Sequence, residues 1–349
     1  MSMKHVIIPV FVPHKGCPND CIFCNQKKIS GQISDMTTDR INEIIEEHLK
    51  TIDEGAFAEI AFYGGSFTAI EKGLQQGFLK EAYKYVTAGR VSEIRLSTRP
   101  DFIDEEILGM LGQYGVRTIE LGVQSLDDDV LKASCRGHDA SCVYRSCDLI
   151  KKMGFRLGIQ TMTGLPGDTR ERCIDTAKKV ISLSPELVRI YPVLVIKGTG
   201  LEKLMKDGLY KPQELDQAVD ICAELLEMYE RCGIKVIRIG LQPTDNISEG
   251  DSDVAAGPFH PAFRQLVESR LALKRIEEAI MSQGLQKARE IIIHTGISNI
   301  SNVVGQKKSN ISYLKNRYGF ERIKVMPGEG TSGDISCTAI SWAVFHGDK

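Results

Sequence analysis

Residues 16–24 read Gly-Cys-Pro-Asn-Asp-Cys-Ile-Phe-Cys, so three cysteines, Cys17, Cys21 and Cys24, fall close together. The segment follows a short apolar run at residues 6–11, which is typical of a β-strand. The thiols are therefore expected in the loop after a strand. Loops in that position carry the chemistry in barrels built of alternating strands and helices. The stretch predicts a metal site at the rim of an α/β fold.

The C-x3-C-x2-C spacing suits an iron–sulfur cluster. Three thiolates can bind three irons of a [4Fe–4S] cluster and leave the fourth iron without a protein ligand. An open iron is a binding site, which the amino and carboxylate groups of S-adenosylmethionine (SAM) fit. The alternative is a closed zinc site of three cysteines and a histidine such as His14. Zinc sites usually pair two short-spaced ligand couples, and no second couple follows here, which favours iron–sulfur.

The first half of the chain alternates short β-rich runs with longer amphipathic ones, the pattern of parallel βα units. Six strands are expected, at residues 6–11, 59–62, 93–97, 118–121, 156–161 and 187–191. Six βα units predict an α/β fold with a partial (β/α)6 barrel, an open relative of the eight-fold TIM barrel. A helix that starts after Asp104 and another that starts at Thr169 have suitable capping residues.

The pattern changes after residue 200. A long helix at 215–232 and a strand at 235–239 precede a loop rich in Asp, Ser and Gly. We expect a barrel domain at 1–240, a linker or mobile loop at 241–257, and a small C-terminal α/β domain at 258–349. The net charge is −2, yet residues 258–330 carry twelve Lys/Arg against six Asp/Glu. This basic module can steer a polyanion such as RNA, or it is simply a solvated face.

No apolar run approaches the length of a membrane span, and the amino-terminus lacks the features of a signal peptide. A cytoplasmic protein without a membrane partner is expected. Ten cysteines in such a chain favour metal or redox chemistry over disulfides. A second cluster on Cys135, Cys142 and Cys147 is disfavoured, because Cys142 and Cys147 lie five apart on an expected helix and share its face poorly.

Together these motifs resemble the radical SAM superfamily. An aromatic residue before the last cysteine belongs to that family's signature, where it lies against the adenine of SAM, which implies this role for Phe23. The run Tyr-Gly-Gly-Ser-Phe-Thr at 63–68 resembles the family's glycine motif. The resemblance implies that Gly64, Gly65 and Ser66 bind the methionine moiety of SAM through exposed backbone.

The run Leu-Gly-Val-Gln-Ser at 121–125 resembles the fourth-strand motif of oxygen-independent coproporphyrinogen oxidases. That similarity implies that Gln124 reaches SAM, and that Ser97 and Arg136 contact its ribose or methionine moiety. The fifth-strand position of that branch is an aspartate, whereas this chain has Gln160. An amide cannot supply the charge of the aspartate, so Gln160 is the weakest of these assignments.

Residues 189–201 resemble the sixth-strand region of the catalytic subunit of Elongator, a tRNA-modifying complex. The similarity does not extend to an acetyltransferase domain, so acetyl transfer is not implied. The family's chemistry implies an enzyme in which the cluster, reduced by a donor such as flavodoxin or ferredoxin, cleaves SAM to a 5′-deoxyadenosyl radical. Tyr191 and Lys197 are expected to face the substrate, with RNA as one candidate. The alternatives are a haem- or RNA-binding protein that keeps the fold without the reaction, or a zinc-stabilised RNA-binding protein.

Overall fold

The computed structural model describes residues 5–12, 17, 21–25, 36–53, 55–241, 252–328 and 334–339. The chain divides into two compact units. The first comprises Met1–Ile221 and Met228–Pro261, and the second comprises Cys222–Glu227 and Ala262–Lys349. Each unit is described by itself.

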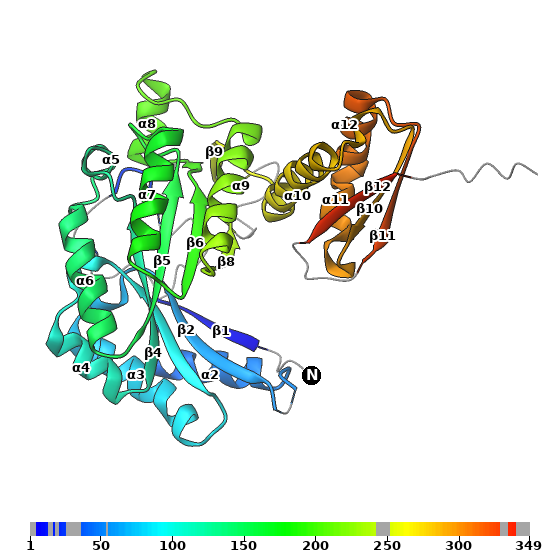
Figure 1. Cartoon of the computed structure of the whole chain (residues 1–349). Helices are drawn as coiled ribbons and strands as arrows, with labels where there is room; N and C mark the ends of the chain where they lie inside the picture. The colour runs from blue at the N-terminus through cyan, green and yellow to red at the C-terminus, as the bar shows by residue number, and fades with distance from the viewer. Residues whose placement is uncertain are drawn as a thin grey trace, which may run out of the picture. The chain divides into compact units, whose positions relative to one another are not determined.

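Seven parallel strands form the sheet of the first unit, in the order β1-β2-β3-β4-β5-β6-β8. They are β1 (His5–Val12), β2 (Phe57–Gly64), β3 (Glu93–Thr98), β4 (Val116–Gln124), β5 (Arg156–Thr163), β6 (Leu187–Pro192) and β8 (Lys235–Ile239). Figure 1 shows them as a curled half-barrel. All six expected strands are confirmed. The expected partial barrel is confirmed, and the strand expected at 235–239 extends its sheet as a seventh strand, parallel to β6.

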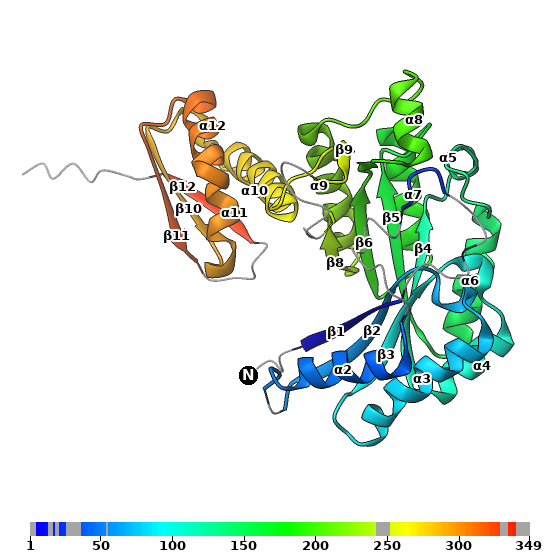
Figure 2. The same cartoon turned by 180° about the vertical axis from the view of Figure 1, so that it is seen from behind.

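Helices connect these strands and cover the outside of the curl (Figures 1 and 2). They are α2 (Thr38–Leu49), α3 (Lys72–Thr87), α4 (Glu105–Gln113), α5 (Asp128–Ala133), α6 (Ala140–Lys152), α7 (Arg170–Ser182), α8 (Gly200–Lys206) and α9 (Leu215–Arg231). The expected caps are present: Asp104 accepts a hydrogen bond from the Ile107 N–H at 2.7 Å, and Thr169 accepts one from the Arg172 N–H at 3.2 Å. Each cap satisfies a backbone donor that the first helical turn leaves unpaired.

The two faces of the sheet differ in character. Successive strand residues point to opposite faces, and the residues toward the helices are apolar and fully buried, such as Ile60, Leu96 and Ile190. The opposite residues line the inside of the curl and include charged groups. The apolar outer layer therefore holds the half-barrel together, while polar side chains remain for the interior.

A buried ionic layer crosses the inside of the half-barrel. Arg95 bonds Glu120 through Nη1 at 3.1 Å and Glu59 through Nη2 at 2.5 Å. Arg189, on β6, bonds the same Glu120 through Nε at 2.5 Å. These charges are almost fully buried, so each depends on its partner, because an unpaired ion in this setting is costly.

Part of the expected linker at 241–257 is ordered structure instead. Strand β9 (Val254–Ala256) pairs antiparallel with β7 (Val195–Ile196), which follows β6 directly. The composition of the segment predicts a loop. Its carboxyl-terminal end nevertheless forms strand hydrogen bonds with β7, a partner that its own sequence does not reveal. The rest of the segment, 242–251, lies outside the described residues.

The second unit packs helices on one face of a three-stranded sheet, β11-β10-β12. Its elements are α10 (Phe263–Ser282), β10 (Glu290–Thr295), α11 (Ile300–Val304), α12 (Ser309–Tyr318), β11 (Arg322–Pro327) and β12 (Ile335–Ala339). Ile276, Ile291, Ile293, Leu314 and Cys337 form its core and are completely buried. The expected small α/β fold of this region is thus present. In the part of the chain that the structure describes, no helix is long and apolar enough to span a bilayer.

Candidate cluster and cofactor site

The predicted metal ligands lie beyond the end of β1. Cys21 is buried, while Cys17 and Cys24 are partly exposed. Cys17 and Cys21 share one neighbour, because Arg99 Nη1 lies 3.9 Å from the first sulfur and 3.8 Å from the second. Among the described residues, no three His, Cys, Asp or Glu side chains are gathered closely enough to enclose a metal ion. Two of the three cysteines thus meet at one guanidinium, and ligation by all three stays a prediction. His14, the ligand of the zinc alternative, lies outside the described residues.

The cysteine segment is hydrogen-bonded to the end of α5 and to the start of α8. The Ile22 N–H donates to the Ser134 carbonyl at 3.3 Å, and the Ile22 carbonyl accepts from the Leu201 N–H at 2.7 Å. Gly200 permits this approach, since a Cβ there would lie 3.3 Å from the Ile22 side chain. Phe23 packs against a buried apolar cluster that includes Leu165. Residues 22 and 23 of the loop are therefore held by contacts with α5, α8 and an apolar cluster.

Two buried guanidinium groups point at the cysteine sulfurs. Arg136 Nη1 donates to Cys21 Sγ at 3.3 Å, and its Nη2 donates to the Gly122 carbonyl. Its buried Nε has no hydrogen-bond partner among the described residues. Arg99 is 3% exposed and forms a bidentate pair with Asp101. Cationic N–H donors beside two thiols fit the thiolates of an iron–sulfur cluster, whose sulfurs accept such bonds.

The pKa of Arg99 reflects this setting. Burial alone would lower it, but the hydrogen bond to Asp101 and the nearby Cys17 and Cys21 raise it above its usual value. The guanidinium therefore stays charged. A permanent cation is held next to two sulfurs in a water-poor place, where charge interactions are strong.

The glycine run follows β2 as expected. Gly64 has φ +109°, and a Cβ at this position would lie 2.5 Å from the Val12 carbonyl oxygen. That oxygen accepts a hydrogen bond from the Gly65 N–H at 3.2 Å, which joins the glycine run to the end of β1. The Ser66 hydroxyl is hydrogen-bonded with Thr98 Oγ1 at 2.8 Å and accepts from the Arg99 N–H at 3.1 Å.

Two more predicted SAM contacts meet on the inside of the half-barrel. Gln160 Nε2 donates to Gln124 Oε1 at 3.3 Å. Gln124 sits at an irregularity in the β4–β5 pairing and has φ +70°, an unusual conformation for a residue with a side chain. Such strain concentrates at functional positions. Ser97 lies on the neighbouring β3 and is partly exposed.

The predicted substrate-facing residues differ from each other in setting. Tyr191 is partly exposed, and its hydroxyl accepts from Arg189 Nη1 at 3.4 Å. Arg189 also donates to the Tyr63 hydroxyl at 2.8 Å, so residues of β2 and β6 meet across the half-barrel. Lys197 is exposed, just beyond the short strand β7.

The sequence reasoning assigned no role to Arg99 or Asp101. The only signal was their place in the loop after the third strand, where chemistry was expected. Of the cysteines considered for a second cluster, Cys135 is exposed and Cys147 is buried, and the absence of that cluster stays a prediction. Burial raises the pKa of the Cys147 thiol to about 12, which keeps it neutral.

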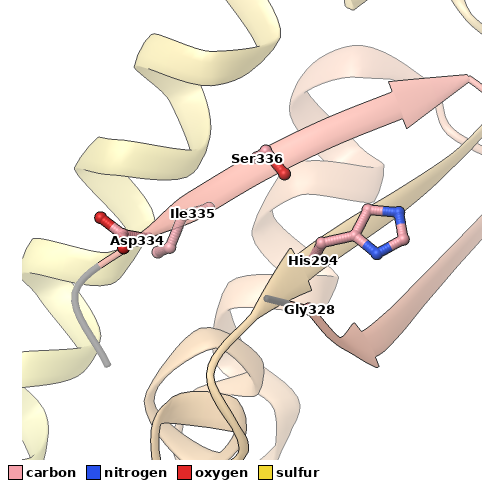
Figure 3. A pocket seen from close by; sticks show the side chains of 5 residues that line it. All are labelled: His294, Gly328, Asp334, Ile335 and Ser336. Atoms are coloured by element: carbon pink, nitrogen blue, oxygen red, sulfur yellow. The ribbon is translucent and has the colours of Figure 1, made fainter. Parts of the chain in front are cut away.

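The second unit has a pocket of its own at the ends of its strands (Figure 3). It is lined by His294, Gly328, Asp334, Ile335 and Ser336. His294 Nε2 lies 3.4 Å from Thr338 Oγ1, and none of the predicted site residues lines this pocket. The cysteine and glycine loops of the first unit thus remain the candidate site.

Known proteins share both the sequence pattern and the fold. The radical SAM superfamily model matches residues 11–180, and the radical SAM C-terminal domain model matches residues 185–272. A tRNA uridine(34) acetyltransferase of Dehalococcoides mccartyi is 28% identical over 233 residues, which cover 61% of this chain and 50% of that protein. An uncharacterised protein of Methanocaldococcus jannaschii is 30% identical over 232 residues, 61% of this chain and 68% of its own.

The solved structure of Methanocaldococcus infernus Elp3 with an N-terminal deletion has the same fold. It superposes with a TM-score of 0.62 at 21% identity, over 81% of this chain and 64% of that one. The chain spans about half the length, or less, of the curated acetyltransferases that it matches. The family models, these relatives and the curled seven-stranded sheet place the chain in the radical SAM superfamily, whose enzymes use a [4Fe–4S] cluster and SAM.

Proposed function

We propose that the chain binds a [4Fe–4S] cluster through Cys17, Cys21 and Cys24 and abstracts hydrogen from a substrate with the help of SAM. The observation that carries this proposal is the approach of two buried guanidinium groups to Cys17 and Cys21. A structural zinc site would also take thiolates, but it would not need a glycine run and a strained glutamine beside it. When bound, the cluster supplies the electron that splits SAM into methionine and a 5′-deoxyadenosyl radical.

The chain's own residues bind and orient SAM in this proposal. The unpartnered Nε of Arg136 is a donor for a carboxylate, and Gln124 and Gln160 offer amides for the ribose. The glycine run offers backbone that no side chain covers. Phe23 presents an aromatic ring on an apolar base for the adenine. These roles follow the family pattern except at Gln160, where the related branch has an aspartate, and each role can be tested by substitution.

The ionic layer below these residues closes the inside of the half-barrel. Glu59, Arg95 and Glu120 are each at most 5% exposed, whereas Tyr63, Gln160 and Tyr191 are partly exposed. The interior is thus sealed at the level of the ion pairs and accessible nearer the strand ends. We place the reacting part of the substrate there, against Tyr191. Exclusion of water protects a reactive species from side reactions.

RNA is the substrate class that we favour. The named relatives include tRNA uridine(34) acetyltransferases and the human Elongator complex protein 3, although the chain spans only 35% of the latter. The second unit carries exposed cations, and Lys307 and Lys308 lie together in the turn before α12. A phosphate backbone binds such groups in a salt-dependent way.

The cations of the basic module do not share one helix. Lys307 and Lys308 precede α12, whereas Lys315 and Arg317 lie at its far end. Arg317 is paired with Glu277, at 3.0 Å. The variant that tests RNA binding is therefore Lys307→Gln with Lys308→Gln, and its control is Arg317→Gln. Binding of a total tRNA pool should weaken in the double variant and lose part of its salt dependence. Equal affinity in all three proteins would favour a small-molecule substrate.

The decisive experiment on the cluster is anaerobic reconstitution with iron and sulfide. Wild-type protein should bind about four irons and cleave SAM to 5′-deoxyadenosine under strong reductant. Cys21→Ala should lose the cluster, while the control Cys147→Ala, a cysteine that is equally buried, should keep it. Stoichiometric zinc without iron would refute the proposal. A haem Soret band without 5′-deoxyadenosine would instead support the binding protein that keeps the fold without the reaction.

A further inference from the structure

Arg99 has an unusually complete set of contacts for a residue that neither the motif nor the spacing singled out. Its Nε and Nη2 donate to the two carboxylate oxygens of Asp101, both at 2.8 Å. Its Nη2 also donates to the Arg136 carbonyl at 2.6 Å. Only Nη1 points elsewhere, toward Cys17 and Cys21. The guanidinium is therefore held by one edge and presents the other edge to the sulfurs.

The same residue joins three loops of the half-barrel. Its backbone N–H donates to the Ser66 hydroxyl at 3.1 Å, which ties it to the glycine run after β2. Its side chain reaches the cysteines beyond β1 and the segment after α5 that contains Arg136. The planar fork of arginine allows this geometry, whereas a lysine has one nitrogen and cannot bond Asp101 and the sulfurs at once.

The pair of Arg99 and Asp101 acts on the sulfurs as an oriented dipole. The positive end lies at Cys17 and Cys21, and the negative carboxylate lies on the far edge of the guanidinium. Reduction adds negative charge to a cluster held by thiolates. A positive end close to the sulfurs stabilises the reduced form, and hydrogen bonds to sulfur act in the same direction.

We propose that Arg99, oriented by Asp101, is a positioning residue that makes the cluster easier to reduce. This inference rests on the proposed cluster site. It predicts opposite effects for the two partners. Loss of the Arg99 cation leaves the Asp101 carboxylate near the sulfurs and disfavours reduction. Loss of the Asp101 charge leaves the cation unbalanced and favours reduction.

The test is a redox titration of the reconstituted cluster, followed by electron paramagnetic resonance in the absence of substrate and SAM. Arg99→Met should move the midpoint potential to more negative values, and Asp101→Asn should move it to less negative values. Arg90→Met is the matched control, because Arg90 forms a bidentate surface pair with Glu46 at 2.6 and 2.9 Å. This control should leave the potential unchanged. Iron content and far-UV circular dichroism are measured on each protein.

If Arg99 and Asp101 only stabilise the loop, both substitutions should lower the iron content to a similar extent. The midpoint potential should then not shift in opposite directions. Unchanged potentials, or shifts of the same sign, would overturn the inference while leaving the cluster itself established. If Arg99→Met does not assemble a cluster, Arg99→Lys and Asp101→Asn decide. Arg99→Lys should then have a more negative midpoint potential than the wild type, and a zero or negative shift in Asp101→Asn refutes the idea. A wild-type protein without iron would refute the proposed function instead.

Discussion

Replacement of Gly64 by alanine tests the coupling between the glycine run and the cysteine loop. Gly64 has φ +109°, and an added Cβ would lie 2.5 Å from the Val12 carbonyl oxygen. Real contacts of this kind do not fall below 3.0 Å, so backbone must shift. The same oxygen accepts the Gly65 N–H, so a shift also weakens that hydrogen bond.

The expected cost has two parts. A side chain at this φ costs about 1–3 kcal/mol, because the conformation is disfavoured for all residues except glycine. Forcing a methyl group against well-packed backbone costs about 1–3 kcal/mol more. We therefore expect Gly64→Ala to lower the free energy of unfolding by about 2–6 kcal/mol.

The control is Gly89→Ala. Gly89 also has a positive φ, +68°, but an added Cβ there meets no atom within 4 Å. Only the conformational part applies, about 1 kcal/mol. The difference between the two variants isolates the clash with β1.

The assay is urea unfolding of the metal-free protein, followed by far-UV circular dichroism. Reconstitution follows, because displacement of the Val12 end of β1 should also lower iron content in Gly64→Ala but not in Gly89→Ala. If the unfolding free energies of the two variants agree within about 0.5 kcal/mol, the end of β1 can move away from the added methyl group at little cost. The steric argument would then be refuted.

Three further predictions concern the surroundings of the site. Burial, and then the neighbouring Arg136 guanidinium, lowers the pKa of His138 to about 4, so the folded form resists protonation. The free energy of unfolding should therefore fall as the pH drops from 6.5 to about 4. Urea titrations at a series of pH values should show a smaller fall in His138→Gln. Arg189→Met removes one of the cations paired with the Glu120 carboxylate and should lower the free energy of unfolding by about 3–5 kcal/mol. Adding Glu120→Gln should restore part of that free energy. If it restores none, the ionic explanation is contradicted. Arg189 donates to the Tyr63 hydroxyl at 2.8 Å and to the Tyr191 hydroxyl at 3.4 Å. Tyr63→Phe should therefore lower the free energy of unfolding by about 1 kcal/mol, and Tyr191→Phe by less. A larger decrease in Tyr191→Phe would contradict this ranking.

Local features of the sequence predicted most of the elements. The six strands and the caps at Asp104 and Thr169 depend on residues a few positions apart, and the structure has them. The seventh strand was recognised at 235–239, yet its membership in the sheet was not. Pairing of β8 with β6 depends on where α9 returns the chain, which no local pattern encodes.

The candidate site divides in the same way. Cys17, Cys21, Cys24, Gly64 and Gly65 could be named because their spacing or backbone freedom is itself the signal. Arg99 could not, because an arginine after a strand has many ordinary roles. Its partners Cys17 and Cys21 lie 82 and 78 residues away in the chain.

The sequence by itself determined the βα order, the clustered cysteines and the likeness to radical SAM proteins, since each depends on short-range spacing. Only the tertiary structure decided what stands beside the sulfurs and what lines the interior. Arg99 meets Cys17, and Arg189 meets Glu120 and Tyr63, because the curl of the sheet brings distant strands together. Burial then makes each of these charges depend on its partner, a constraint that appears only after the chain has folded.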